Sequence, residues 1–289
     1  MSQAETTASI HDIGYRHYEG PRLGRRYAVL SLYLHGLRGT FGLGRAARYK
    51  VVPFILLGIT AAPAVISAAI AALTPFQPIA YTSYTYYLQL PIMLFVAAQA
   101  PQLVSGDTRS RVLSLYFSRP LERSDYVWAR LAGLATALLL VMALPLAILY
   151  VAALLGHVHS PTDAWDESRR FLVGVGGIAV QAVVLASLGL AIACLTRIRV
   201  FAVAAVIGVY LVSDGVVSTI LGVTRGGAVA AAFFTPFQLQ DWFQAWALRV
   251  SPVLPPGPGQ AGPLFGLGVV VLVAACVGVL LLRYRSAES

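Results

Sequence analysis

Residues 131–155, LAGLATALLLVMALPLAILYVAALL, form a continuous, almost entirely apolar run without a charged side chain. As an α-helix this run would be about 37 Å long, which exceeds the roughly 30 Å hydrocarbon core of a bilayer. Helices satisfy their own backbone hydrogen bonds in lipid, whereas irregular segments do not. The run therefore predicts a membrane-spanning helix.

The whole chain has the same character. It is 58% hydrophobic and 11% charged, whereas soluble domains are roughly 25% charged. Runs of membrane-spanning length occur at about 51–73, 86–104, 131–155, 171–196, 200–222 and 264–282. The second is interrupted by Pro91, Gln99, Pro101 and Gln102, and we expect it to face protein, because neighbouring helices satisfy polar groups within a membrane. We predict an all-α integral membrane protein with six transmembrane helices in a domain at 51–285.

The positions of the basic residues predict the orientation of these spans. Of the 21 Lys and Arg residues, all but four fall on one side of the expected topology. The exceptions are Arg169, Arg170, Arg225 and Arg249. Because short loops rich in Lys and Arg stay in the cytosol, we expect both termini to be cytosolic. The net charge of +9 then reflects topology and attraction to anionic membrane lipids, and we expect no nucleic-acid partner.

An amphipathic pattern precedes the first span, within a cytosolic N-terminal segment at 1–50. Six apolar residues recur at intervals of three and four and fall on one stripe of a helix: Leu23, Tyr27, Leu30, Leu34, Leu37 and Phe41. The pattern predicts an amphipathic helix lying in the membrane interface. The alternative is a cytosolic helix packed on another soluble element, but the chain has little soluble sequence to supply one.

The cytosolic segment at 105–130, between the second and third spans, is basic and broken by turn-forming residues, yet it contains an apolar cluster. The cluster comprises Val112, Leu113, Leu115, Tyr116 and Phe117. It is too short to span a bilayer and too apolar to lie in water without a partner surface. An ordinary positive-inside loop would explain the charge of the segment but not the cluster, so we expect a short helix that docks on another protein.

At this segment the chain resembles the membrane-spanning permease of type 2 ABC exporters (the ABC-2 type). In that family a short cytosolic coupling helix inserts into a separate ATPase subunit, and an amphipathic helix precedes the first span. The matching residues are Asp107, Leu113, Arg119, Pro120, Leu121, Arg123 and Arg130, whereas Arg111 and Val112 stand where the family pattern has Gly-Thr. The opening segment at 11–22, HDIGYRHYEGPR, resembles a high-GC bacterial subgroup of these permeases.

The resemblance implies a function. The chain would be the permease subunit of an ATP-driven ABC transporter that exports or flips an amphipathic substrate across the bacterial cytoplasmic membrane. The implied ATPase-coupling residues are Asp107, Arg111, Val112, Leu113, Leu115, Tyr116, Phe117, Arg119, Pro120 and Arg123. ATP and Mg would bind the ATPase partner, and this chain would bind no cofactor. Six spans form half of a translocation path in this family, so we expect a homodimer of permeases with two ATPase subunits.

Few polar residues lie within the expected spans. Asp214 is the one acidic residue in the middle of a span, and intramembrane charges are costly enough to be functional candidates. It lies about 21 Å from the inner end of its span, so hydration among the outer head groups is an equal alternative. The other pathway candidates are Gln99, Gln102, Gln181 and Ser213, with Ser187 as a further polar residue. They either line a polar pathway or form hydrogen bonds between helices.

The external loop at 223–263 contains an aromatic pattern. Leu239, Trp242, Phe243 and Trp246 fall on one face of a short helix, before a Pro- and Gly-rich stretch. Trp and Phe are common at the depth of the outer head groups, so a structural aromatic belt is one interpretation. The family resemblance adds another, because type 2 permeases place short helices here that cap the outer end of the pathway.

Several function classes lack their motifs. The chain has no Gly-x-x-x-x-Gly-Lys-Ser/Thr loop, so we do not expect it to hydrolyse ATP itself. We find no nucleophile with its base and no acidic cluster for magnesium, and Cys194 and Cys276 lack metal-like spacing, so we expect neither an enzyme nor a metal site. An ATP-independent secondary carrier and a lipid-modifying enzyme stay open as alternatives, although carriers usually show internal repeats and none is evident.

The topology can be tested by thiol labelling. In intact cells, Pro161→Cys and Gly259→Cys should react with a membrane-impermeant thiol reagent, because both positions are expected outside. Ser110→Cys and Arg197→Cys should react only after the membrane is permeabilised. Labelling of position 110 from the outside would overturn the six-span topology.

Overall fold

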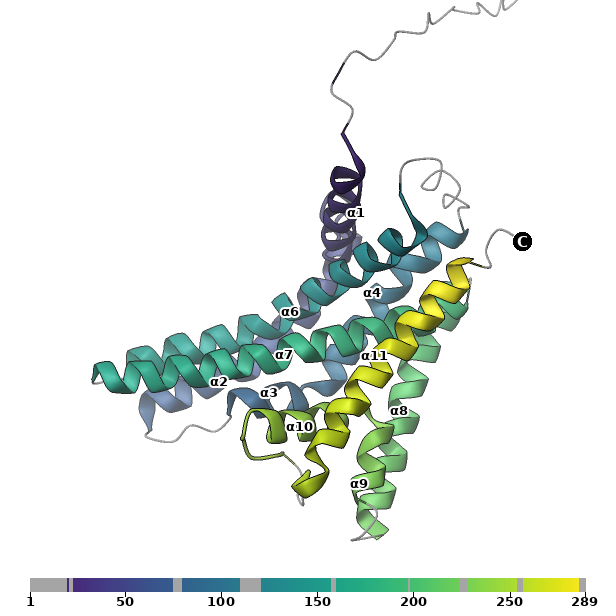
Figure 1. The fold of residues 1–289 in the computed structure, drawn as a ribbon. Helices are drawn as coiled ribbons and strands as arrows, with labels where there is room; N and C mark the ends of the chain where they lie inside the picture. Colours follow the sequence, from purple (N-terminus) through teal and green to yellow (C-terminus); the bar gives the residue numbers. More distant parts are fainter. Residues whose placement is uncertain are drawn as a thin grey trace, which may run out of the picture.

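The computed structural model describes residues 20, 23–74, 80–109, 121–156, 160–196, 198–223, 228–253 and 257–285. Every regular element among them is a helix, so the predicted all-α class is confirmed for this part of the chain (Figure 1). In chain order the elements are α1 (Arg25–Thr40), α2 (Arg48–Leu73), α3 (Tyr81–Tyr87), α4 (Gln89–Arg109), α6 (Arg123–Gly156), α7 (Pro161–Leu195), α8 (Arg199–Val223), α9 (Ala228–Ala231), the 3-10 helix η1 (Ala232–Phe234), α10 (Pro236–Ala247), the 3-10 helix η2 (Gly259–Ala261) and α11 (Gly262–Arg285).

Five of the described helices are long and apolar enough to cross a membrane, namely α2, α6, α7, α8 and α11. The helices α3 and α4 qualify only as a pair, which is bent by 65°. The bundle therefore contains five membrane-length helices, or six if the bent pair forms one span. The predicted second span at 86–104 is the one that differs, because it is not a straight helix.

The break between α3 and α4 follows from Pro91. A proline has no N–H, so Pro91 cannot donate to the Tyr87 carbonyl, and the helical hydrogen-bond pattern is interrupted there. Leu88 stands at the break, and the pattern resumes where the Ile92 N–H donates to the Leu88 carbonyl at 3.2 Å. The interruption noted in the sequence is thus a bend between two helices.

The helices α6 and α7 extend well beyond the apolar runs at 131–155 and 171–196 that predicted them. α7 begins at Pro161, where the Ser160 hydroxyl caps the helix by accepting a hydrogen bond from the Asp163 N–H at 3.2 Å. Proline suits this first position because its missing N–H would have had no helical partner. With 35 residues, α7 is about 52 Å long. Hydrophobicity marked only the apolar part of each helix, since polar turns continue the same hydrogen-bond pattern.

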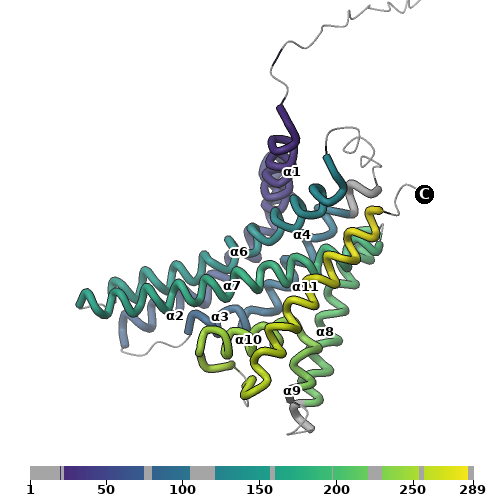
Figure 2. Tube along the Cα trace, viewed as in Figure 1, coloured from purple at the N-terminus to yellow at the C-terminus, as the bar shows by residue number. Residues whose placement is uncertain are grey.

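α7 is the central helix of the bundle (Figures 1 and 2). Its apolar window is 67% buried, whereas those of α2 and α8 are each 22% buried. Glycines allow its neighbours to come close: a Cβ atom at Gly189 would collide with a Val96 methyl of α4, and one at Gly177 would collide with the Gln244 amide of α10. Small residues of this kind are the usual means by which membrane helices pack.

The helix α1 lies steeply across α6 instead of running with the bundle (Figure 1). The two helices meet at Gly133, where an added Cβ atom would lie 3.4 Å from the Leu37 backbone nitrogen and 3.5 Å from the Tyr33 carbonyl oxygen. The buried residues of α1 are Leu32, Gly36, Gly39 and Thr40. Glycine on both sides of the crossing therefore lets the two backbones approach closely.

The first four residues of the apolar stripe predicted before the first span are exposed, whereas the last two, Leu37 and Phe41, pack partly against the core. Leu23, Tyr27 and Leu30 are 54–56% exposed and Leu34 is 38% exposed. α1 is thus apolar on two faces, one against α6 and one without a protein cover among the described residues. An interfacial helix requires such a second face, because it buries that face in lipid. The interfacial location itself stays a prediction.

Most of the described basic residues lie at or near helix ends, and these ends are grouped at one end of the bundle (Figure 1). α6 begins where α11 ends, and the Arg123 guanidinium donates to the Arg285 carbonyl oxygen at 3.4 Å. The start of α8 and the end of α4 lie toward the same end of the bundle. The first turns of α7 and the turn after α10 lie toward the other. This arrangement agrees with the alternation of spans used above, and the side that faces the cytosol stays a prediction.

The crossing of α1 and α6 predicts an unequal response to two glycine substitutions. Gly133→Leu should force the two backbones apart and lower the free energy of unfolding by about 1–3 kcal/mol, the usual cost of overpacking. Gly58→Leu on α2 is the matched control, because nothing lies within 4 Å of a Cβ atom placed there. The measurement is the thermal unfolding midpoint of both variants in one detergent. Equal midpoints would contradict the close crossing.

Candidate functional site

The start of α6 is held to α1 by a cluster of charges. The Arg25 guanidinium donates to Asp125 through Nε at 2.7 Å and through Nη2 at 2.9 Å, and it also donates to Glu122. Asp125 in addition accepts from the Glu122 N–H at 3.1 Å, so it also holds the chain just before α6. The hydrogen bonds to Asp125 and then to Glu122 raise the pKa of Arg25, which stays charged at any physiological pH.

This cluster of charges positions α1 relative to α6 and contributes little to the free energy of folding. The side chains of Arg25 and Glu122 are 48% and 63% exposed, and exposed ion pairs contribute little to the free energy of folding. Asp125 is better enclosed, at 16% exposed. The bidentate geometry of Arg25 on Asp125 sets the direction of both side chains, so it aligns α1 with the first turn of α6.

The end of α11 packs against the same part of α6. The rings of Tyr126 and Tyr284 meet edge to face with centroids 5.1 Å apart. One turn farther along α6, Arg130 is 4% exposed and its guanidinium lies 5.3 Å from the centroid of the Tyr126 ring. The ring face offsets part of the cost of burying that charge. We call the convergence of α1, α11 and the start of α6, at Arg25, Glu122, Arg123 and Asp125, the α6 anchor.

The structure places only part of the predicted coupling segment. Asp107 lies in α4, where the backbone alone is described, and Arg123 is the first residue of α6. The predicted coupling residues Arg111, Val112, Leu113, Leu115, Tyr116, Phe117, Arg119 and Pro120 lie outside the described residues, as does nearly all of the opening segment at 11–22. The coupling role of these residues stays a prediction, and what the structure adds is the anchor that follows them.

The two most buried pathway candidates do not lie side by side. Gln99 and Gln181 are 0% and 3% exposed. On α7, Gly189 abuts Val96 and Ala100 of α4, which places Gln99 near the level of Gly189. Gln181 lies about 12 Å earlier along α7. The two amides are therefore separated by about two helical turns and form no continuous polar face.

The other pathway candidates are bonded within their own helices or lie near one end. Gln102, Ser187 and Ser213 each donate to a carbonyl in the preceding turn, at 3.1, 2.8 and 2.9 Å. Asp214 is partly buried on α8, one turn beyond Tyr210, whose ring packs against Phe237 of α10 at 6.0 Å. Asp214 is thus close to the level of α10, which favours hydration from that end over a position at the centre of the bundle.

The short helix expected from the aromatic pattern is present as α10, and most of its aromatic face points inward. Trp242 is 0% exposed and Leu239 is 2% exposed. Trp242 meets Phe265 of α11 edge to face at 5.2 Å, and Phe243 packs partly buried against the same cluster. Only Trp246 is largely exposed, at 44%. Three of the four residues therefore join α10 to the core, while a role in capping a pathway stays a prediction.

Sequence reasoning missed the buried amides on α10. Gln238, Gln240 and Gln244 are 1%, 0% and 4% exposed. Gln240 Nε2 donates to the Gly177 carbonyl at 3.1 Å, and the Tyr86 hydroxyl donates to Gln238 Oε1 at 3.1 Å, so α10 is hydrogen-bonded to α7 and α3. Three glutamines in a 12-residue helix were the available signal. The sequence did not show whether these glutamines faced water or were buried against protein.

The described residues include two cysteines and several contacts between arginines and carboxylates. In the described part of the chain, no group of three or more His, Cys, Asp and Glu side chains is placed to hold a metal ion. Cys194 and Cys276 are free and buried. Ion pairs among the described residues join an arginine to one or two carboxylates, as Arg25 joins Glu122 and Asp125 in the α6 anchor.

Comparison with protein-family models and with curated proteins finds no match to this chain. Its class therefore rests on the fold: the chain is all-helical in its described part and has five or six helices that could cross a membrane, which indicates a multi-pass membrane protein.

Gln99 and Gln240 form a matched pair for testing the buried amides. Both are 0% exposed, but among the described residues neither polar atom of Gln99 has a hydrogen-bond partner, whereas Gln240 donates to Gly177. Gln99→Leu should leave the thermal unfolding midpoint unchanged or raise it, and Gln240→Leu should lower the free energy of unfolding by about 1 kcal/mol. An equal loss in both variants would show that Gln99 has a bonding partner of its own.

Proposed function

We propose that this chain is the permease subunit of an ATP-driven exporter of the type 2 ABC class, which exports or flips an amphipathic substrate across the bacterial cytoplasmic membrane. A separate ATPase subunit binds ATP and Mg and docks on the segment between α4 and α6. A second copy of the permease completes the translocation path. The observation that carries the proposal is the α6 anchor, because it ties α1 and α11 to the turn that directly follows this segment.

A coupling segment passes motion to a bundle only if its junction with the bundle is firm. The segment here ends at Glu122, and both Glu122 and Asp125 are bound by Arg25 of α1. Arg123 reaches the last residue of α11. A displacement of the segment would therefore act on α1, α6 and α11 together. A loop that served only to carry positive charge would have no need of this arrangement.

The geometry of α1 supports the same function. The helix crosses α6 steeply (Figure 1), and four residues of its apolar stripe are exposed: Leu23, Tyr27, Leu30 and Leu34. A helix that lies in the interface while touching the start of α6 links the membrane surface to the coupling segment. The resemblance of the chain to type 2 permeases implies an interfacial helix at this point of the sequence.

The composition of the spans favours an amphipathic cargo over a small ion. The polar candidates within the bundle are neutral amides and hydroxyls, apart from Asp214. The helices α2 and α8 are mostly unburied within a single chain, and this leaves apolar surface for lipid and for a second copy. A path formed between two copies would therefore be bordered mainly by apolar side chains.

The runner-up function is an ATP-independent secondary carrier, and a lipid-modifying enzyme is the third. Purification in mild detergent distinguishes the proposed ABC permease from these two alternatives. An ABC permease should be recovered with a co-encoded protein that contains a Gly-x-x-x-x-Gly-Lys-Ser/Thr loop, whereas a carrier or an enzyme should be recovered without one.

Docking is tested by placing a carboxylate in the apolar cluster. Leu113→Asp and Phe117→Asp should each release the ATPase or uncouple ATP hydrolysis from transport, because burial of such a side chain contributes roughly 1.5–3 kcal/mol and a buried charge adds a further cost. The measurements are co-purification of the ATPase and transport per ATP consumed, with membrane insertion as a check on folding.

Leu73→Asp is the matched control. Leu73 ends α2 at the other end of the bundle and is 86% exposed, so the same chemical change should leave ATPase recovery at the wild-type level. Wild-type recovery and wild-type coupling in both Leu113→Asp and Phe117→Asp would refute the docking role of the segment.

A further inference from the structure

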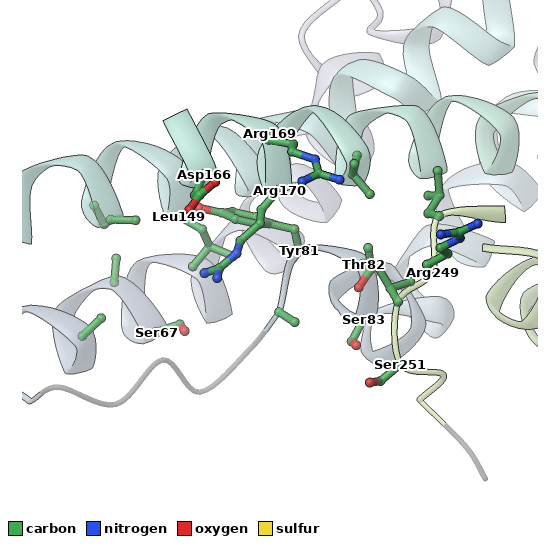
Figure 3. A pocket seen from close by; sticks show the side chains of 18 residues that line it. Ser67, Tyr81, Thr82, Ser83, Leu149, Asp166, Arg169, Arg170, Arg249 and Ser251 are labelled. Carbon is green, nitrogen blue, oxygen red and sulfur yellow. The ribbon is translucent and has the colours of Figure 1, made fainter. Parts of the chain in front are cut away.

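A cavity of about 720 Å³, whose lining side chains are drawn in Figure 3, lies at the end of the bundle away from the α6 anchor. Its walls come from the last turns of α2 and α6, the first turns of α3 and α7, and the turn that follows α10. Small-molecule sites commonly enclose about 300–1,000 Å³, so the cavity is large enough for a ligand. The function proposed above does not account for it.

Three arginines line this cavity. Arg169 and Arg170 extend from α7, and Arg249 extends from the turn after α10 (Figure 3). They are three of the four basic residues that depart from the charge asymmetry of the chain. Asp166 is the one carboxylate among the described lining residues, so the lining carries more positive than negative charge. Residues far apart in the sequence thus place an excess of guanidinium groups around one space.

Two of these guanidinium groups are not neutralised by the protein as described. Arg169 and Arg249 have no ion pair with any described residue, whereas Arg170 lies 3.6 Å from Glu167 Oε2. Glu167 is 7% exposed and also accepts a hydrogen bond from the Tyr81 hydroxyl, so its carboxylate is already engaged. The lining therefore attracts anions and disfavours a metal cation.

The backbone of Arg249 adds an independent observation. Its φ of 54° is the only positive φ of a non-glycine residue in the described part of the chain. It follows the last turn of α10, where glycine is the usual residue because it adopts this conformation without a steric penalty. Glycine at this position would adopt the same backbone conformation with less strain. Strained residues of this kind are concentrated at functional sites, and this one lines the cavity.

The remaining lining residues indicate the chemistry of the ligand. Hydroxyl groups of Thr82, Ser83 and Ser251 border the cavity and can donate hydrogen bonds to an oxyanion. Arginine forks match the oxygens of phosphate, and a tetrahedral phosphate can accept from several donors at once. Leu149 and Val173 supply apolar wall beside these groups.

We propose that this cavity binds a phosphate group, presented by the head group of an anionic phospholipid. The apolar part of the lining favours a lipid over free phosphate, because Leu149, Ala153 and Val173 form apolar flanks beside the arginines. Acyl chains could pack on these flanks while the phosphate meets the arginines. The inference goes beyond the proposed transport function and needs no ATPase.

The test uses the purified full-length chain in a neutral detergent. Dioleoyl-phosphatidylglycerol should raise the thermal unfolding midpoint in a saturable way, because a ligand of the folded state stabilises it. Dioleoylglycerol, which has the same chains without the phosphate, should produce no saturable rise. Sodium phosphate distinguishes the two sources: a saturable rise with phosphate alone would support the site with free phosphate as its ligand, and no rise would support a lipid head group.

Arg169→Gln and Arg249→Gly test the site itself. Each should raise the half-saturating concentration of phosphatidylglycerol about tenfold or more, because each removes charged hydrogen bonds to the phosphate. Arg249→Gly should unfold at the wild-type temperature or higher without lipid, since glycine relieves the strained backbone, so its loss of binding cannot be due to misfolding. Arg26→Gln, an exposed residue of α1, is the control and should bind as the wild type does.

Two results would overturn the proposal. One is an unchanged half-saturating concentration of phosphatidylglycerol in both Arg169→Gln and Arg249→Gly. The other is an equal response to dioleoylglycerol and phosphatidylglycerol in the wild-type protein. Because no step involves an ATPase, a failure of the coupling experiments would leave this result untouched.

Discussion

Close packing against the glycines of α7 is the constraint on which the rest of the structure depends. In a membrane, apolar helices gain no hydrophobic free energy from leaving lipid for one another, so contact distance largely decides whether they associate. Gly189 admits Val96 of α4, and Gly177 admits Gln244 of α10. These contacts seat α4 and α10 on α7. The position of α10 in turn places Arg249 at the cavity.

The arginines at the two ends of the bundle differ in their partners. At the α6 anchor, Arg25 is bound by carboxylates and Arg123 by a backbone carbonyl. At the cavity, Arg169 and Arg249 have no ion pair with any described residue. α6 is one continuous helix that touches both places, since it begins at the anchor and contributes Leu149 to the cavity wall. α6 therefore connects the region proposed for docking with the cavity proposed for lipid, and Pro145 lies between them.

The helix α10 shows why burial changes the meaning of a pattern. Its aromatic residues have the composition of a head-group belt, yet Trp242 is fully buried against Phe265. Its glutamines have the composition of a solvated surface, yet Gln240 is fully buried and bonds to Gly177. Periodicity predicted the helix correctly. It could not reveal that protein covers both faces, because that cover comes from α7, α3 and α11.

The sequence by itself determined the helical class, the membrane-length runs and the uneven distribution of charge, because each depends on residues that are close together along the chain. The tertiary structure decided which side chains meet. The pairing of Arg25 with Asp125, the separation of Gln99 from Gln181 and the placement of Arg170 and Arg249 at one cavity all join or divide residues far apart in sequence. Such contacts depend on how the helices cross, and no local pattern specifies that geometry.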